Sequence, residues 1–131
     1  MKVLALDYGS ARTGVAVSDA TGTLARPLEV VRRAAGEAGL ARVAALVAEH
    51  EVERIVVGLP LTLRGERGEQ VRETERFVAA LSAVVSVPVV TYDERFTTAL
   101  AAGQGASRAP EDARAAAFLL TSYLERAGVD S

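Results

Sequence analysis

Cysteine is absent from this chain of 131 residues, and histidine occurs only once, as His50. Without cysteine the chain can form no disulfide bond and can use no thiol nucleophile, which suits a reducing cytoplasm. Because His50 stands alone between two glutamates, we interpret it as a solvated helix end and exclude metal sites built from several histidines. Half of the residues are apolar and 24% are charged, so we expect a single globular domain over residues 1–131.

Lysine is nearly absent as well, because Lys2 is the only one and all other basic side chains are arginines. The net charge of −2 also lacks the basic excess that is typical of nucleic-acid-binding proteins. Two interpretations of the arginines stay open. Their guanidinium groups can each bind phosphate through two hydrogen bonds, or they reflect a GC-rich genome, which the frequent alanine also indicates.

No long apolar run opens the chain. The apolar stretch 3–6 ends at Asp7 and is too short for a signal peptide or a membrane span. We therefore assign this stretch to the fold and expect a cytoplasmic protein that does not associate with membranes.

Short apolar segments alternate with turns and with segments of helical periodicity along the whole chain. We expect strands at 3–7, 13–18, 27–31, 54–58 and 87–92 and helices at 40–51, 69–85, 98–102 and 110–127. Gly128 should close the last helix, and residues 64–68 should form a loop. This order predicts an α/β fold in which an antiparallel meander and parallel strands share one mixed five-stranded sheet, with helices on both faces.

Acidic residues stand where two of these strands end. Asp7 follows the first strand, and Gly9 and Gly14 beside it allow a tight turn and a close approach to phosphate or metal. Functional sites commonly lie at the carboxyl ends of parallel strands, so the Asp7 side chain should point into a cleft. A plain hairpin turn is the alternative, and nucleotide-binding kinases of the actin and sugar-kinase type share this pattern.

A second polar cluster follows the last strand and comprises Asp93, Glu94, Arg95, Thr97 and Thr98. Thr97 is a suitable cap for the next helix, which would explain the threonine but not the adjacent acids. Arg95 either pairs with those acids or reaches a substrate phosphate.

Asp112 is the third acidic position, in the first turn of the expected last helix. Steps of 100° per residue place it on the same face as Ala116, Leu119 and Tyr123, which should pack on the sheet. An acid in a first helical turn also favours the helix dipole by about 0.3–1 kcal/mol. Glu111 would serve that purpose equally well, so we favour a functional role for Asp112.

Together these positions would bring several carboxylates into one cleft. Carboxylates at such short distances repel one another unless a cation lies between them. Oxygen donors without cysteine or histidine favour Mg²⁺ or Mn²⁺, and such ions support phosphodiester cleavage.

The chain resembles the YqgF/RuvX family, which comprises Holliday junction resolvases and nucleases of ribosomal RNA maturation with a ribonuclease H-like fold. The matching stretches are 6–9, 12–19, 57–61, 93–98, and Asp112 with 115–116, 119–120 and 123–124. The resemblance implies that Asp7, Glu94 and Asp112 are the catalytic acids and metal ligands, with Asp93 as the alternative in the middle role. Two departures from the family pattern weaken the expected phosphate binding. Ser10-Ala11 stand where the family often has a lysine, and the loop 103–109, which is often basic in the family, has Arg108 as its only basic residue.

We therefore expect a metal-dependent nuclease that acts on structured RNA or branched DNA, as a monomer or a homodimer. The resemblance implies a role in maturing the 5′ end of the 16S ribosomal RNA precursor or in resolving junctions. The residues expected to bind the substrate are Gly9, Arg12, Arg64, Arg67, Arg95, Thr97 and Thr98. Arg64 and Arg67 could equally be solvated loop charges. The rival functions are a non-catalytic RNA-binding assembly factor and a nucleotide-binding ATPase-like module.

Overall fold

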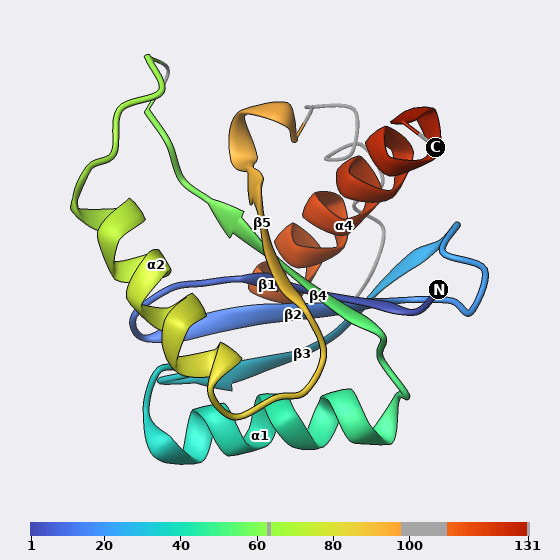
Figure 1. Cartoon of the computed structure of the whole chain (residues 1–131), viewed down its shortest axis with the longest axis horizontal. Coiled ribbons are helices and arrows are strands. Elements are labelled where there is room, and N and C mark those ends of the chain that lie inside the picture. The colour runs from blue at the N-terminus through green and yellow to red at the C-terminus, as the bar shows by residue number, and fades with distance from the viewer. Residues whose placement is uncertain (63, 98–109, 131) are drawn as a thin grey trace.

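One mixed sheet organises the molecule (Figure 1). The computed structural model describes residues 1–62, 64–97 and 110–130, and its five strands lie in the order β3-β2-β1-β4-β5. β1 (Val3–Asp7), β2 (Arg12–Ser18) and β3 (Ala25–Arg32) form an antiparallel meander. β4 (Arg54–Leu59) and β5 (Val89–Asp93) continue the sheet parallel to β1. The predicted mixed five-stranded sheet is confirmed.

Helices cover both faces of this sheet, as expected. α1 (Glu37–Glu49) and α2 (Glu69–Ser82) enclose one apolar core, in which Leu6, Val57 and Phe77 are buried. α4 (Glu111–Asp130) encloses a second core on the opposite face, through Ala116, Leu119 and Leu120. A short 3-10 helix, η1 (Glu94–Phe96), follows β5 directly. Within the described residues no helix has both the length and the apolar character needed to cross a membrane.

Several element boundaries differ from the sequence-based expectation, for identifiable reasons. β3 begins at Ala25 and contains Pro27, which is tolerated because β3 is an edge strand whose register shifts at this point. β5 begins at Val89 rather than 87, and Pro88 contributes only its carbonyl, which accepts a hydrogen bond from Ile55. Gly128 lies inside α4 instead of closing it, since a helical glycine costs only about 1 kcal/mol.

The other two long helices also differ from expectation, and α1 does so at both ends, since it ends at Glu49 rather than 51. α1 begins at Glu37, three residues earlier than expected, and α2 ends at Ser82, three residues earlier than expected. The helix expected at 98–102 lies outside the described residues.

Candidate functional site

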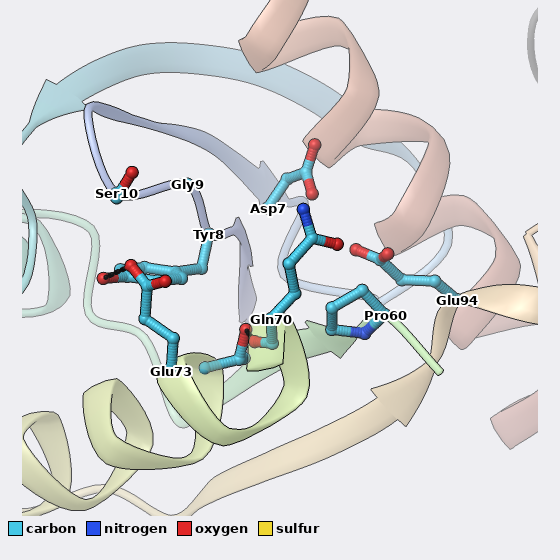
Figure 2. A pocket seen from close by; sticks show the side chains of 9 residues that line it. Asp7, Tyr8, Gly9, Ser10, Pro60, Gln70, Glu73 and Glu94 are labelled. Carbon is cyan, nitrogen blue, oxygen red and sulfur yellow. Dashed lines mark hydrogen bonds between the residues drawn. The ribbon is translucent and has the colours of Figure 1, made fainter. Parts of the chain in front are cut away.

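Asp7 and Glu94 meet at the carboxyl edge of the parallel part of the sheet. Asp7 is the last residue of β1, and Glu94 opens η1 immediately after β5, with β4 between the two strands. Their side chains share a hydrogen bond, and Figure 2 shows the two carboxyl groups turned toward each other. The structure thus brings together two acids that are 87 positions apart in the chain.

Gly58 in β4 provides the space in which the Glu94 side chain lies. A Cβ atom on Gly58 would stand 2.5 Å from Glu94 Oε1 and 2.9 Å from its Cγ, closer than real Cβ atoms approach. Gly58 is not among the residues that the sequence pattern predicts for the site. A glycine inside a buried strand was the available signal, because it often marks a close approach by another group.

Burial and mutual repulsion disturb the ionisation of this pair. Burial is the main cause that raises the pKa of Asp7, and the nearby charge of Asp112 raises it further. Burial, followed by the charge of Asp7, raises the pKa of Glu94 to about 7. Near neutral pH and without a cation, the pair therefore shares a proton, and its two titrations are coupled.

Asp112 lies beside this pair because α4 starts directly on β2. Gly14 is paired with Asp7 in the β1–β2 ladder, and a Cβ atom on Gly14 would overlap the backbone carbonyl of Asp112. The close approach that Gly14 permits is therefore to the start of α4. The Asp112 carboxylate points to Arg12, with 3.4 Å between Arg12 Nε and Asp112 Oδ2.

Asp93 is engaged with its own chain neighbour. Its carboxylate accepts hydrogen bonds from the backbone N–H of Arg95 at 2.9 Å and from the Arg95 guanidinium, with the shortest contact at 2.6 Å. The hydrogen bonds from the Arg95 side chain are the main cause that lowers the pKa of Asp93. Asp93 thus caps η1 and holds Arg95, while Glu94 is the acid that faces Asp7.

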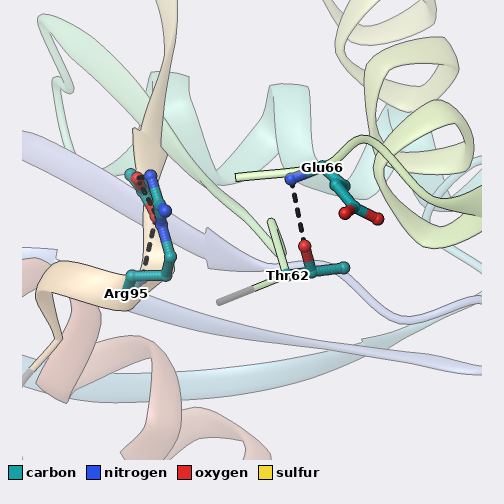
Figure 3. A network of polar contacts seen from close by, with 4 residues as sticks. Thr62, Glu66 and Arg95 are labelled. Atoms are coloured by element: carbon teal, nitrogen blue, oxygen red, sulfur yellow. Dashed lines mark hydrogen bonds and ion pairs between the residues drawn. The ribbon is translucent and has the colours of Figure 1, made fainter. Parts of the chain in front are cut away.

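The loop after β4 approaches Arg95 (Figure 3). Thr62 closes a turn in this loop, because its hydroxyl accepts a hydrogen bond from the Glu66 backbone and its carbonyl accepts one from Gly65. Gly65 adopts a φ of +79°, and the Arg95 guanidinium lies beside it. The loop and η1 therefore pack against each other next to the acidic pair.

The remaining residues predicted to bind substrate are spread around the pair. Gly9 makes the expected tight turn, since a Cβ atom there would stand 2.5 Å from the Arg12 carbonyl oxygen. Arg64 is exposed, and Arg67 is bound to Glu75 at 2.6 Å. The Thr97 hydroxyl is buried and has no hydrogen-bond partner among the described residues. Thr98 lies outside the described residues.

Two cavities flank the Asp7–Glu94 pair. One, of about 210 Å³, opens toward α2, and Figure 2 shows Gln70 reaching from that helix toward the two acids. On its wall the Tyr8 hydroxyl donates to Glu73 at 3.3 Å. The sequence analysis did not predict Gln70 or Glu73, although their spacing of three residues on α2 was visible. The second cavity, of about 250 Å³, opens toward α4 and is lined by Thr97 and Phe118.

The donor set fits a hard divalent cation. Asp7 and Glu94 offer carboxylate oxygens in direct proximity, without a sulfur or nitrogen ligand, as Mg²⁺ and Mn²⁺ prefer. Within the described parts of the chain, however, no three acidic or histidine side chains stand close enough together to form a complete site. The charge of Asp112 acts on Asp7, but the Asp112 carboxylate is turned to Arg12.

The pH dependence of stability should reveal the acidic pair. The folded protein holds the Glu94 proton more tightly than the unfolded chain, whose glutamate pKa is 4.5. The resulting stabilisation is complete below that value and is lost as pH rises through about 7. Between about pH 5 and pH 8, the unfolding free energy of metal-free wild-type protein should therefore fall by roughly 1–2 kcal/mol relative to that of Glu94→Gln, after allowance for solvent screening. Urea titrations of both proteins measure this difference, and a wild-type stability that stays constant or rises with pH relative to Glu94→Gln would contradict the raised pKa of Glu94.

Comparison with known proteins places the chain in a family. The family model described as "RuvX: Holliday junction resolvase" matches residues 1–126. A "Putative pre-16S rRNA nuclease" of Chloroflexus aurantiacus is 41% identical, with 94% of this chain and 86% of the relative covered. A protein of the same name from Desulforudis audaxviator is 40% identical, with 95% and 94% covered.

Solved structures agree on the fold. The structure titled "T. thermophilus RuvC in complex with Holliday junction substrate" matches with a TM-score of 0.69 at 21% identity and covers 98% of this chain and 96% of that chain. A fowlpox virus resolvase in complex with junction DNA matches with a TM-score of 0.56 at 13% identity, over 97% and 99% of the two chains. At such low identity these matches establish the ribonuclease H-like architecture alone. The family model over residues 1–126 and the relatives about 40% identical show that this chain belongs to the RuvX family.

Proposed function

We propose that this protein is a metal-dependent nuclease whose site is formed by Asp7, Glu94 and Asp112. Membership in a family of resolvases, with relatives named as nucleases, makes the chain a hydrolase that acts on ester bonds. The single observation that supports the metal dependence is the half-buried, hydrogen-bonded Asp7–Glu94 pair, in which the pKa of Glu94 is raised to about 7. In this proposal residues 1–131 act as one nuclease domain in the cytoplasm.

The acidic pair is unfavourable for the metal-free fold and unfavourable for simple binding of nucleic acid. Two carboxyl groups buried side by side reduce stability unless a proton or a cation lies between them. A protein that only bound RNA would gain nothing from negative charge placed toward phosphate. The retained pair therefore supports an enzyme over a non-catalytic assembly factor.

Each residue has a proposed task in this site. Asp7 and Glu94 would hold the ion, and Asp112 would complete the set by turning away from Arg12, which is only 3.4 Å from it. Mg²⁺ or Mn²⁺, when bound, supplies the positive charge that activates a water and stabilises a leaving oxygen. Thr97 lines the cavity between the acidic pair and α4, and its buried hydroxyl has no hydrogen-bond partner among the described residues.

The predicted contacts to the substrate divide into two groups. Arg12 can bind phosphate once Asp112 has turned to the ion, and Gly9 allows the substrate backbone to approach closely. Arg95 and Arg67 are held by acidic partners, so in this proposal they reach a phosphate only by exchanging those partners, whereas Arg64 is exposed at the rim. Thr98 stays a proposal from the sequence pattern.

The names of the relatives support RNA as the substrate class. Both relatives compared above are named for the 16S ribosomal RNA precursor. We therefore propose that this protein matures the 5′ end of that precursor, with resolution of branched DNA as the second activity. Resolution of a symmetric junction would require a homodimer, whereas RNA processing is open to a monomer.

Cleavage should require Mg²⁺ or Mn²⁺ and should stop when a chelator is added. Purified protein would be incubated with labelled precursor RNA, duplex DNA and a four-way junction, with each ion and with excess chelator. Glu94→Gln protein, prepared in the same way, controls for a contaminating nuclease. Cleavage that persists in chelator, or equally in the Glu94→Gln sample, would refute the metal-dependent mechanism.

A further inference from the structure

Arg12 and Arg32 stand side by side at a third cavity, and Arg32 has no part in the site described so far. This cavity, of about 310 Å³, lies between the β2–β3 ladder and the first turn of α4. Its lining comprises Arg12, Val30, Arg32, Pro110, Glu111 and Asp112. We propose that Arg12 and Arg32 together bind a backbone phosphate of the nucleic-acid substrate, next to the phosphate that is cut. This inference rests on the proposed nuclease function.

The two arginines are direct cross-strand partners. In the β2–β3 ladder the Cα of Arg12 is paired with that of Arg32, and both side chains reach the cavity on the α4 face. Side chains at such positions have Cβ atoms about 4.5–5.5 Å apart. Two guanidinium groups at this spacing can contact the same anion, and each offers the fork of donors that matches phosphate oxygens.

Without an anion, this pair is electrostatically unfavourable. Like charges directly opposite each other on neighbouring strands destabilise a sheet. Arg12 is offset by the Asp112 carboxylate at 3.4 Å, whereas no ion pair to Arg32 is found among the described side chains. Glu111 and the two arginines are all exposed, so water screens the attraction of Glu111 as well as the repulsion between the arginines. The arrangement therefore supports a ligand of negative charge.

The position of the pair matches a phosphate beside the reaction centre. Gly14 is paired with Asp7, and Arg12 lies two residues before Gly14 on the same strand, about 7 Å away along β2. Asp112 links the acidic pair to the two arginines, since its charge acts on Asp7 and its carboxylate contacts Arg12. Because the Arg12–Asp112 pair is accessible to solvent, a substrate phosphate can displace the Asp112 carboxylate from Arg12 even without an ion, and a turn of Asp112 to the ion would release Arg12 further.

The salt dependence of binding tests this site without any cleavage. Anisotropy of a fluorescently labelled DNA duplex would be measured in chelator over a range of salt concentrations. For B-DNA the log–log slope changes by about 0.9 for each phosphate contact. Arg32→Ala should therefore flatten the slope by about 0.9, and the double variant with Arg12→Ala by up to about 1.8.

Arg26→Ala is the matched control. Arg26 is an exposed arginine on the same strand but is paired with Val17, at the opposite end of the β2–β3 ladder. Its replacement should leave the slope unchanged, and melting curves should show that all three variants fold. A wild-type slope in Arg32→Ala, or an equal loss in Arg26→Ala, would overturn this site while leaving the nuclease proposal intact. Wild-type protein that binds no nucleic acid at all would overturn the nuclease proposal as well.

Discussion

Replacing Asp7 with asparagine should abolish cleavage without lowering the stability of the metal-free protein. Asparagine keeps the shape of aspartate and can donate a hydrogen bond to Glu94, but it removes one of the two charges that repel each other. Loss of a partner around a metal site commonly reduces affinity or activity 10–100-fold. Loss of a direct ligand should therefore reduce cleavage by at least about 100-fold.

Thermal melts with and without Mn²⁺ separate the two effects. In wild-type protein, Mn²⁺ should stabilise the fold by RT ln(1 + [L]/Kd), and this stabilisation should shrink in Asp7→Asn. If Asp7 were a satisfied structural residue instead, its replacement would cost about 1–3 kcal/mol without metal. A variant that melts far below wild type in chelator and still cuts would show that Asp7 is structural.

Asp19→Asn is the contrasting control. The Asp19 carboxylate accepts hydrogen bonds from Thr21, Thr23 and Leu24, and these lower its pKa to about 2. Its ionised form is therefore stabilised by the fold, the reverse of the situation at Asp7. Asp19→Asn should lower the melting temperature and leave cleavage and the response to Mn²⁺ unchanged.

Replacing Gly58 with alanine should inactivate the protein by displacing Glu94. The added methyl group would stand 2.5 Å from Glu94 Oε1, so the carboxylate would have to leave its position beside Asp7. A displacement of about 1 Å in a catalytic group can reduce the rate about 100-fold. Because all the atoms that the methyl group would meet belong to the flexible Glu94 side chain, the fold itself should lose little stability.

Gly68→Ala controls for the addition of a methyl group. No atom lies within 4 Å of a Cβ at Gly68, which precedes α2, and its φ of −83° suits any residue. Both variants would be assayed for cleavage and for the melting shift in Mn²⁺. Gly58→Ala should lose both signals while still melting cooperatively, and Gly68→Ala should keep both. Full cleavage by a well-folded Gly58→Ala protein would mean that the position of Glu94 is not critical.

Much of this site could be predicted from local sequence. Asp7 directly follows a short apolar run, and the adjacent acids Asp93 and Glu94 directly follow another strand segment. Strand order then fixes that parallel strands present their carboxyl ends at one edge, so Asp7 and Glu94 had to lie near each other. The position of Asp112 followed from helical periodicity in the same way.

Other features depended on contacts between distant segments. The choice between Asp93 and Glu94 stayed open until the 3-10 turn directed Asp93 to Arg95 and Glu94 to Asp7. Gln70 and Glu73 reach the cavity only because α2 crosses the sheet beside Tyr8. Periodicity indicates which face of a helix is apolar, but not which residues of a neighbouring strand it will cover.

The sequence by itself therefore determined the order of the elements, the mixed sheet and the acids at its carboxyl edge, because apolar runs, turns and strand ends are local signals. Only the tertiary structure decided that Gly58 makes space for Glu94, that Gly14 admits the start of α4, and that Arg32 faces Arg12. Each of these depends on strand register or on the separation between packed elements. A shift of one residue reverses the face on which a strand side chain points, so such contacts are fixed only when the whole sheet has formed.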